Sequence, residues 1–176
     1  NTSTKINDRP CAFRYPRGTG LGAVLPSINE KIEIGKSKII QEGKKLAILN
    51  FGARLNETLK AAVNLKKKGV IITIVDARFA KPLDENLIWQ LAVTHEAIMT
   101  IEEGSIGGFG SHVVDLLTKR GLMDGNLKFR SMTLPDIFID QGTPDNMYKV
   151  ANLDSSSIEE KVLDLLNSNI ILQKQK

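Results

Sequence analysis

The chain has 176 residues, and 41% of them are hydrophobic, which is enough for one domain with its own core. A single cysteine, Cys11, excludes an intrachain disulfide framework and a multi-cysteine zinc site. The net charge is +4, but aromatic residues make up only 5% of the chain and do not alternate with basic ones, and no apolar run approaches the ~18 residues of a membrane span. We therefore expect neither nucleic acid nor a membrane as a partner.

The first 24 residues are predicted to form an irregular arm. Within it, residues 12–15 are expected to form a short strand, because Pro16 pushes the residue before it toward extended geometry. The glycines from Gly18 to Gly22 lack the enclosing strand–helix unit of a nucleotide-binding loop, so they are predicted to form a linker. A partly extended stretch follows over residues 26–43.

From residue 46 onward, strands and helices are predicted to alternate. Short apolar runs predict strands at residues 46–51, 70–75, 97–101 and 127–132. Helical periodicity predicts helices between these strands, a short helix at 144–150 and a last helix with serine caps at 155–157 and a capping box at Glu159 and Glu160. This order predicts an α/β fold in residues 25–176: three α/β/α layers around a mostly parallel sheet.

A glycine loop at residues 104–110 lies between a predicted strand and a predicted helix. Such a loop can bind a phosphate through backbone N–H groups, but its spacing matches neither the Walker nor the Rossmann pattern. The alternative, which we favour, is a tight turn with close packing of the helix on the sheet.

Two histidines invite a catalytic interpretation. Ser111, His112 and Asp115 lie within about one helical turn, whereas a hydrolytic triad is normally assembled from distant segments, so Ser111 is predicted to be a helix N-cap. His95 ends a helix, where a cation would favour the helix dipole. The small number of histidine and cysteine residues predicts no metal site.

Arginines give the sharper signal. Arg14 and Arg17 flank Tyr15-Pro16, and Arg78 follows the second buried strand. Ligands of open α/β sheets gather beyond the carboxyl ends of the strands, and arginine binds phosphate or carboxylate through two parallel donors. A structural ion pair of Arg78 with Asp76 or Asp84 is the alternative, and the residues alone leave both open.

Eight blocks in fixed order carry a family resemblance. They are Phe13-Arg14-Tyr15-Pro16-Arg17-Gly18, Leu46–Gly52, Val75–Asp84, Thr94–Ala97, Glu102–Gly104, Gly107–Ser111, Leu134–Asp136 and Gln141–Thr143. Together they resemble the C-terminal part of the 1-deoxy-D-xylulose-5-phosphate synthases, within the transketolase family. On this resemblance, residues 1–24 are the last strand and exit linker of a preceding pyrimidine-binding domain, and residues 25–176 are a transketolase C-terminal-like domain.

The resemblance also implies a function. Enzymes of this kind use thiamine diphosphate and Mg²⁺ to condense pyruvate with glyceraldehyde 3-phosphate, giving 1-deoxy-D-xylulose 5-phosphate and CO₂ for non-mevalonate isoprenoid, thiamine and pyridoxal biosynthesis. The parent protein is then a cytoplasmic homodimer, and the partners of this chain are the N-terminal and middle domains of the same protein.

For the site, the resemblance implies that Arg14 and Arg78 bind the phosphate of the aldehyde substrate, and it leaves open whether Arg14 or Arg17 is the main ligand. The Gly-Asp-Gly motif that binds the diphosphate is missing, since only Asp124-Gly125 occurs here. We therefore expect no catalytic, cofactor-binding or metal-binding residue in this chain, and a fragment that is inactive by itself. The alternatives are the matching domain of a 2-oxoacid dehydrogenase beta subunit and a non-enzymatic regulatory or assembly module of the same fold.

Overall fold

A computed structural model of the chain describes residues 1–16, 27 and 30–173. In this part of the chain a short 3-10 helix, η1, comes first, strands and helices alternate from β2 to β5, and two helices, α4 and α5, follow. The strands are β1 Lys38–Gln41, β2 Leu46–Phe51, β3 Thr73–Asp76, β4 Ala97–Glu102 and β5 Lys128–Met132. The helices are η1 Ser3–Lys5, α1 Leu55–Lys67, α2 Glu85–Thr94, α3 Phe109–Lys119, α4 Pro144–Val150 and α5 Ser155–Gln173.

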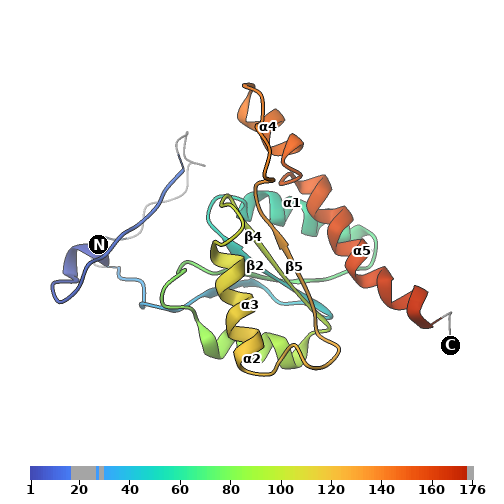
Figure 1. Ribbon diagram of the computed structural model, residues 1–176, viewed down its shortest axis with the longest axis horizontal. Coiled ribbons are helices and arrows are strands. Elements are labelled where there is room, and N and C mark those ends of the chain that lie inside the picture. Colours follow the sequence, from blue (N-terminus) through green and yellow to red (C-terminus); the bar gives the residue numbers. More distant parts are fainter. Residues whose placement is uncertain (17–26, 28–29, 174–176) are drawn as a thin grey trace.

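The five strands form one sheet in the order β1-β3-β2-β4-β5. β1 pairs antiparallel with β3, and the other neighbours are parallel. Helices α1 and α5 cover one face and α2 and α3 cover the other, as Figure 1 shows. The predicted three-layer α/β/α fold with a mostly parallel sheet is confirmed.

The core consists of two apolar clusters, one on each face of the sheet. Successive side chains of a strand point to opposite faces, so Leu46 and Ile48 of β2 enter the α1–α5 cluster, while Ala47 and Leu49 enter the α2–α3 cluster. All four are buried. Burial on both faces explains why the sequence of this strand is a continuous apolar run rather than an alternating one.

Some element ends differ from the prediction. β3 begins at Thr73 rather than at residue 70, because Val70 N donates to Leu65 O and so still closes the end of α1. The predicted serine caps of α5 are wrong. Asp154 Oδ1 accepts the Ser157 N–H at 3.2 Å instead, and Glu159 pairs with Lys68 at 2.6 Å rather than closing a capping box.

The arm lies outside the three layers (Figure 1). The strand predicted at residues 12–15 is wrong: in the described part of the chain, no strand precedes β1. A strand forms only where a neighbouring strand accepts its backbone hydrogen bonds. Arg17, the glycines from Gly18 to Gly22 and the predicted domain boundary at residue 24 lie outside the described residues. None of the helices in the described part is long and apolar enough to cross a bilayer.

Candidate functional site

The carboxyl ends of the four parallel strands meet at one edge of the sheet. After β2 the chain turns to α1 on one face, and after the neighbouring β4 it turns to α3 on the opposite face. The gap between the ends of two such strands is the place where open α/β sheets bind ligands. In this domain, side chains of the domain itself fill that gap.

An arginine and a glutamate meet between the two strand ends. Arg54, which stands at the N-cap position of α1, places Nε 2.7 Å from Oε1 of Glu103, the residue after β4. The guanidinium also lies 3.5 Å from the centre of the Tyr148 ring, so α4 is joined to the same pair. Burial is the largest of the effects that raise the pKa of Tyr148, and the hydrogen bond with Glu103 is the second. This cluster was missed by sequence reasoning.

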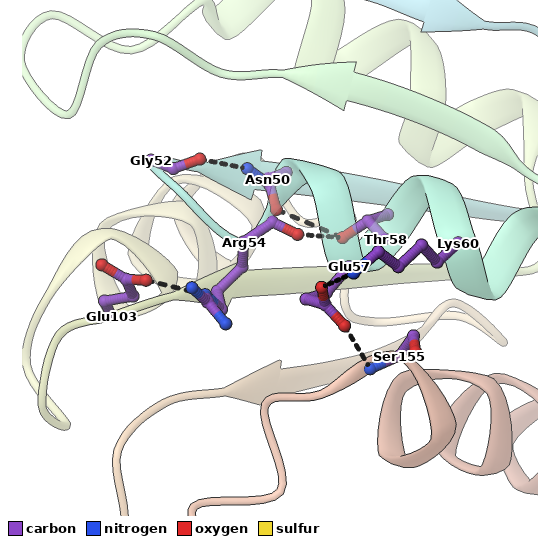
Figure 2. A network of polar contacts seen from close by, with 8 residues as sticks. All are labelled: Asn50, Gly52, Arg54, Glu57, Thr58, Lys60, Glu103 and Ser155. Carbon is purple, nitrogen blue, oxygen red and sulfur yellow. Dashed lines mark hydrogen bonds and ion pairs between the residues drawn. The ribbon is translucent and has the colours of Figure 1, made fainter. Parts of the chain in front are cut away.

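Hydrogen bonds fix the loop that carries Arg54 (Figure 2). The buried Asn50 side chain donates to Gly52 O at 2.8 Å. Thr58 Oγ1 lies 3.2 Å from Asn50 Oδ1 and 3.1 Å from Arg54 O. The turn from β2 into α1 is therefore bonded on both sides, and Arg54 cannot shift without breaking these contacts.

Glu57, one turn into α1, ties this network to α5. Its carboxylate accepts the Ser155 N–H at 3.1 Å and pairs with Lys60 at 2.6 Å (Figure 2). Burial acts to raise the pKa of Glu57, but the hydrogen bonds from Lys60 and Ser155 outweigh it and the net shift is downward. The carboxylate therefore stays charged where it caps α5.

The glycine loop closes around Glu102, the last residue of β4. The carboxylate of Glu102 is buried and accepts N–H groups from Phe109 at 3.0 Å and Gly110 at 2.8 Å, at the N-terminus of α3. A Cβ on Gly104 or Gly108 would overlap Glu102 Oε2. The packing interpretation of the loop is confirmed, and the anion that its amides bind is the carboxylate of Glu102.

The serine–histidine–aspartate grouping forms no triad. The N-cap of α3 is Gly108, so the prediction of Ser111 as cap is wrong; Ser111 Oγ instead accepts the Gly107 N–H at 3.1 Å. Asp115 pairs with Lys119 at 2.8 Å. Within the described residues, no hydrogen bond joins Ser111, His112 and Asp115 to one another.

His95 follows the end of α2, as predicted, and sits between two hydroxyl groups. Its Nε2 lies 2.8 Å from Thr73 Oγ1 and its Nδ1 lies 2.9 Å from Thr94 Oγ1. Burial lowers the pKa of His95, partly opposed by its hydrogen bond to Leu91 O. The imidazole therefore acts through hydrogen bonds rather than as the cation we expected. Across the part of the chain that the structure describes, no three His, Cys, Asp or Glu side chains could share a metal ion.

Arg78 lies at the carboxyl end of β3, at the edge of the sheet where the parallel strands end. Its backbone has a φ of 58°, and Phe79 N donates to Ala77 O at 2.6 Å across it. Its Nε is 3.5 Å from Asp76 Oδ2, so one of the two ion pairs that the sequence left open is formed. Both side chains remain 29% exposed, which leaves the guanidinium accessible to a ligand.

Arg14 is exposed on the arm. Its neighbours in the sequence, Phe13 and Tyr15, stack their rings with centroids 6.1 Å apart. Within residues 1–16, 27 and 30–173, no acidic side chain pairs with both Arg14 and Arg78. The convergence of these two arginines on one phosphate stays a prediction for the complete enzyme.

Comparison with known families gives a direct assignment. Residues 35–158, more than two thirds of the chain, match the model described as "Transketolase, C-terminal domain". The chain belongs to the transketolase C-terminal domain family. The matched range begins just before β1 and ends at the start of α5, so it contains the whole sheet and the filled strand gap.

One solved structure agrees with this assignment. A split-gene transketolase described as an inactive beta4 tetramer matches this transketolase domain with 26% identity and a TM-score of 0.72, over 82% of this chain and 46% of that chain. A transketolase mutant from Pichia stipitis matches with 14% identity and a TM-score of 0.49, over 74% of this chain and 18% of that one, a likeness that carries no argument. The domain thus spans about half the length of the first of these relatives.

Transketolases depend on thiamine diphosphate. The glycine loop at residues 104–110 does not fit the diphosphate of that cofactor. The N-terminus of α3, where loop amides could bind a phosphate, already holds the buried Glu102 carboxylate, which would repel a second anion.

Proposed function

We propose that this domain is the C-terminal part of a 1-deoxy-D-xylulose-5-phosphate synthase. The observation that carries the proposal is the series of eight sequence blocks in order, two of which surround Arg14 and Arg78. The reaction condenses pyruvate with glyceraldehyde 3-phosphate and releases CO₂. Thiamine diphosphate, when bound with Mg²⁺ by the other domains, supplies the decarboxylation and carries the two-carbon unit.

The role we assign to this domain is recognition of the substrate phosphate. Arg78 sits at the carboxyl edge of the sheet with a partly exposed guanidinium, and Arg14 sits on the arm that leads toward the preceding domain. Two guanidinium groups match the oxygens and charge of a phosphate dianion. The N-terminal and middle domains complete the enzyme, which we expect to be a cytoplasmic homodimer. The isolated domain is expected to be inactive.

The two alternatives have less support. The substrates of a 2-oxoacid dehydrogenase carry no phosphate, so that reaction would give Arg14 and Arg78 no dianion to bind. A purely regulatory or assembly module would need neither arginine. The likeness to a transketolase at 26% identity favours the transketolase branch over both.

Kinetics of the full-length enzyme test the proposal. Losing one guanidinium removes charge-assisted bonds of about 1.5–3 kcal/mol, so Arg78→Ala and Arg14→Ala should each raise the KM for glyceraldehyde 3-phosphate about 10- to 100-fold. The KM for pyruvate and kcat should change little. Arg130→Ala, which removes an exposed guanidinium from β5, is the matched control and should behave as wild type. Unchanged KM values in folded variants would leave the Arg78–Asp76 pair as purely structural, and a parent protein that makes no deoxyxylulose phosphate would refute the assignment.

A further inference from the structure

Arg78 occupies a backbone conformation that its residue type avoids. A φ of 58° costs a residue with a Cβ about 1–2 kcal/mol relative to the right-handed region, and glycine is the residue that adopts it freely. The 2.6 Å hydrogen bond from Phe79 N to Ala77 O closes a three-residue turn centred on Arg78, and turns of this kind with a positive φ are rare and strained. Backbone strain of this sort persists where the surrounding structure enforces it, and it is concentrated at ligand sites.

The surrounding structure does enforce this turn. Ala77, just before Arg78, is buried, and its N–H donates to Asn50 O of β2 at 2.8 Å. On the other side, Ser37 Oγ donates to Ala77 O at 3.2 Å, and Ser37 N donates to Asp84 Oδ2 at 2.9 Å. Ser37 precedes β1, which pairs with β3, so it joins the first residue of the turn to the aspartate that caps α2.

The guanidinium of Arg78, in contrast, is weakly held. Its ion pair with Asp76 is long, at 3.5 Å, and both side chains are partly exposed. Such a pair contributes little to stability. The ion pair with Asp76 therefore does not explain why an arginine occupies this strained position. A glycine would adopt the backbone conformation without strain and would lose only this weak ion pair.

We propose that the turn Ala77–Phe79 is a preorganised phosphate grip, in which Ser37 is the positioning residue that holds the backbone of Arg78. The ligand is a phosphate monoester, so this inference rests on the proposed function. Fixing the turn before the ligand arrives removes the ordering cost from binding, and the phosphate replaces the weak contact with Asp76. Ser37 touches no ligand and acts through Ala77 O.

Variants of Arg78 distinguish the backbone strain, which the melting temperature reports, from phosphate binding, which chemical shifts report. Arg78→Gly relieves the left-handed conformation and Arg78→Ala keeps it, so Arg78→Gly should melt about 2–6 °C above Arg78→Ala. Inorganic phosphate is the binding probe, followed by the ¹H–¹⁵N signals of Arg78 Nε and the Phe79 amide at constant ionic strength. We expect a saturable shift in wild type at about millimolar phosphate, no such shift at Phe79 in either Arg78 variant, and a three- to tenfold weaker response in Ser37→Ala, roughly the effect of one hydrogen bond.

Ser111→Ala is the matched control, because it also removes one serine hydroxyl that bonds a loop backbone, at the start of α3. It should titrate as wild type. If wild type gives no saturable shift, or if Arg78→Ala keeps the wild-type response at Phe79, the preorganised grip is refuted, and the KM of the full-length enzyme still decides the proposed function separately. If both Arg78 variants lose the response while Ser37→Ala matches wild type, the positioning role of Ser37 alone is refuted. An Arg78→Gly variant that melts no higher than Arg78→Ala would show that the turn is unstrained, and would refute the preorganised grip.

Discussion

Glu102 is the residue on which the geometry of the glycine loop depends. Its carboxylate is buried with two backbone N–H groups as partners, and glycines lie against it where a side chain would overlap its oxygen. Two of the loop glycines are therefore required by their neighbour rather than by a positive φ. An isolated buried carboxylate would be costly, and the amides at the start of α3 offset that cost.

This packing leads to a prediction for Gly108. A Cβ added there meets the Glu102 carboxylate, so Gly108→Ala must displace a buried charge from its two donors and should destabilise the domain by about 1–3 kcal/mol. Gly125→Ala is the control, since a Cβ there meets nothing within 4 Å. Thermal denaturation of the two variants decides between these outcomes. Equal melting temperatures would mean that the loop yields without disturbing Glu102.

At the scale of elements, the Arg54–Glu103–Tyr148 cluster joins parts that are far apart in the sequence. It connects the start of α1, the end of β4 and the helix α4, and Figure 2 shows its arginine anchored through the backbone to Thr58. Open α/β sheets bind ligands at this position. In this domain the cluster occupies it and holds α1, β4 and α4 together.

A double-mutant cycle measures this joint. Arg54→Met leaves the mostly buried Glu103 carboxylate without its cation, so we expect a loss of about 1–3 kcal/mol in the free energy of unfolding. Adding Glu103→Gln removes the unpaired charge and should recover part of the loss. Urea denaturation of the single and double variants gives the coupling energy. Strictly additive effects would show that the two side chains do not interact in solution.

The elements themselves were predictable where one physical effect dominates. Strands buried on both faces are continuous apolar runs, so β2 and β4 were placed within a residue of their ends. Caps were less predictable. Several serines and aspartates compete at the start of α5, and only the folded contacts select Asp154. The contact of Arg54 with Glu103 spans 49 positions, and the one signal in the sequence was an arginine soon after a strand, as at Arg78.

At the scale of the whole molecule, the two apolar clusters share the strands of one sheet, so neither can come apart alone. We expect this chain to fold by itself and to unfold in one cooperative transition. We also expect it not to bind thiamine diphosphate. The glycine loop at residues 104–110 joins a strand to a helix, as a diphosphate-binding loop would, but the carboxylate of Glu102 occupies the amides at the start of that helix.

Two measurements check these expectations on a chain of verified mass. Calorimetric melting should give one transition whose measured enthalpy equals the van't Hoff value, and a flat melt without a near-ultraviolet signal would contradict independent folding. Titration calorimetry with thiamine diphosphate and Mg²⁺ should give no more heat than Mg²⁺ alone. Micromolar binding would overturn our account of the missing diphosphate site.

The carboxylate of Glu102 has a further consequence for turnover of the protein. Ligands that bind only the folded state stabilise it by mass action, so proteins with open anion sites resist unfolding and proteolysis better when the metabolite is abundant. Here the anion at the start of α3 is covalently part of the chain, at a fixed effective concentration. The contribution of this loop to the stability of the domain is therefore set by the sequence itself rather than by the supply of a nucleotide or diphosphate.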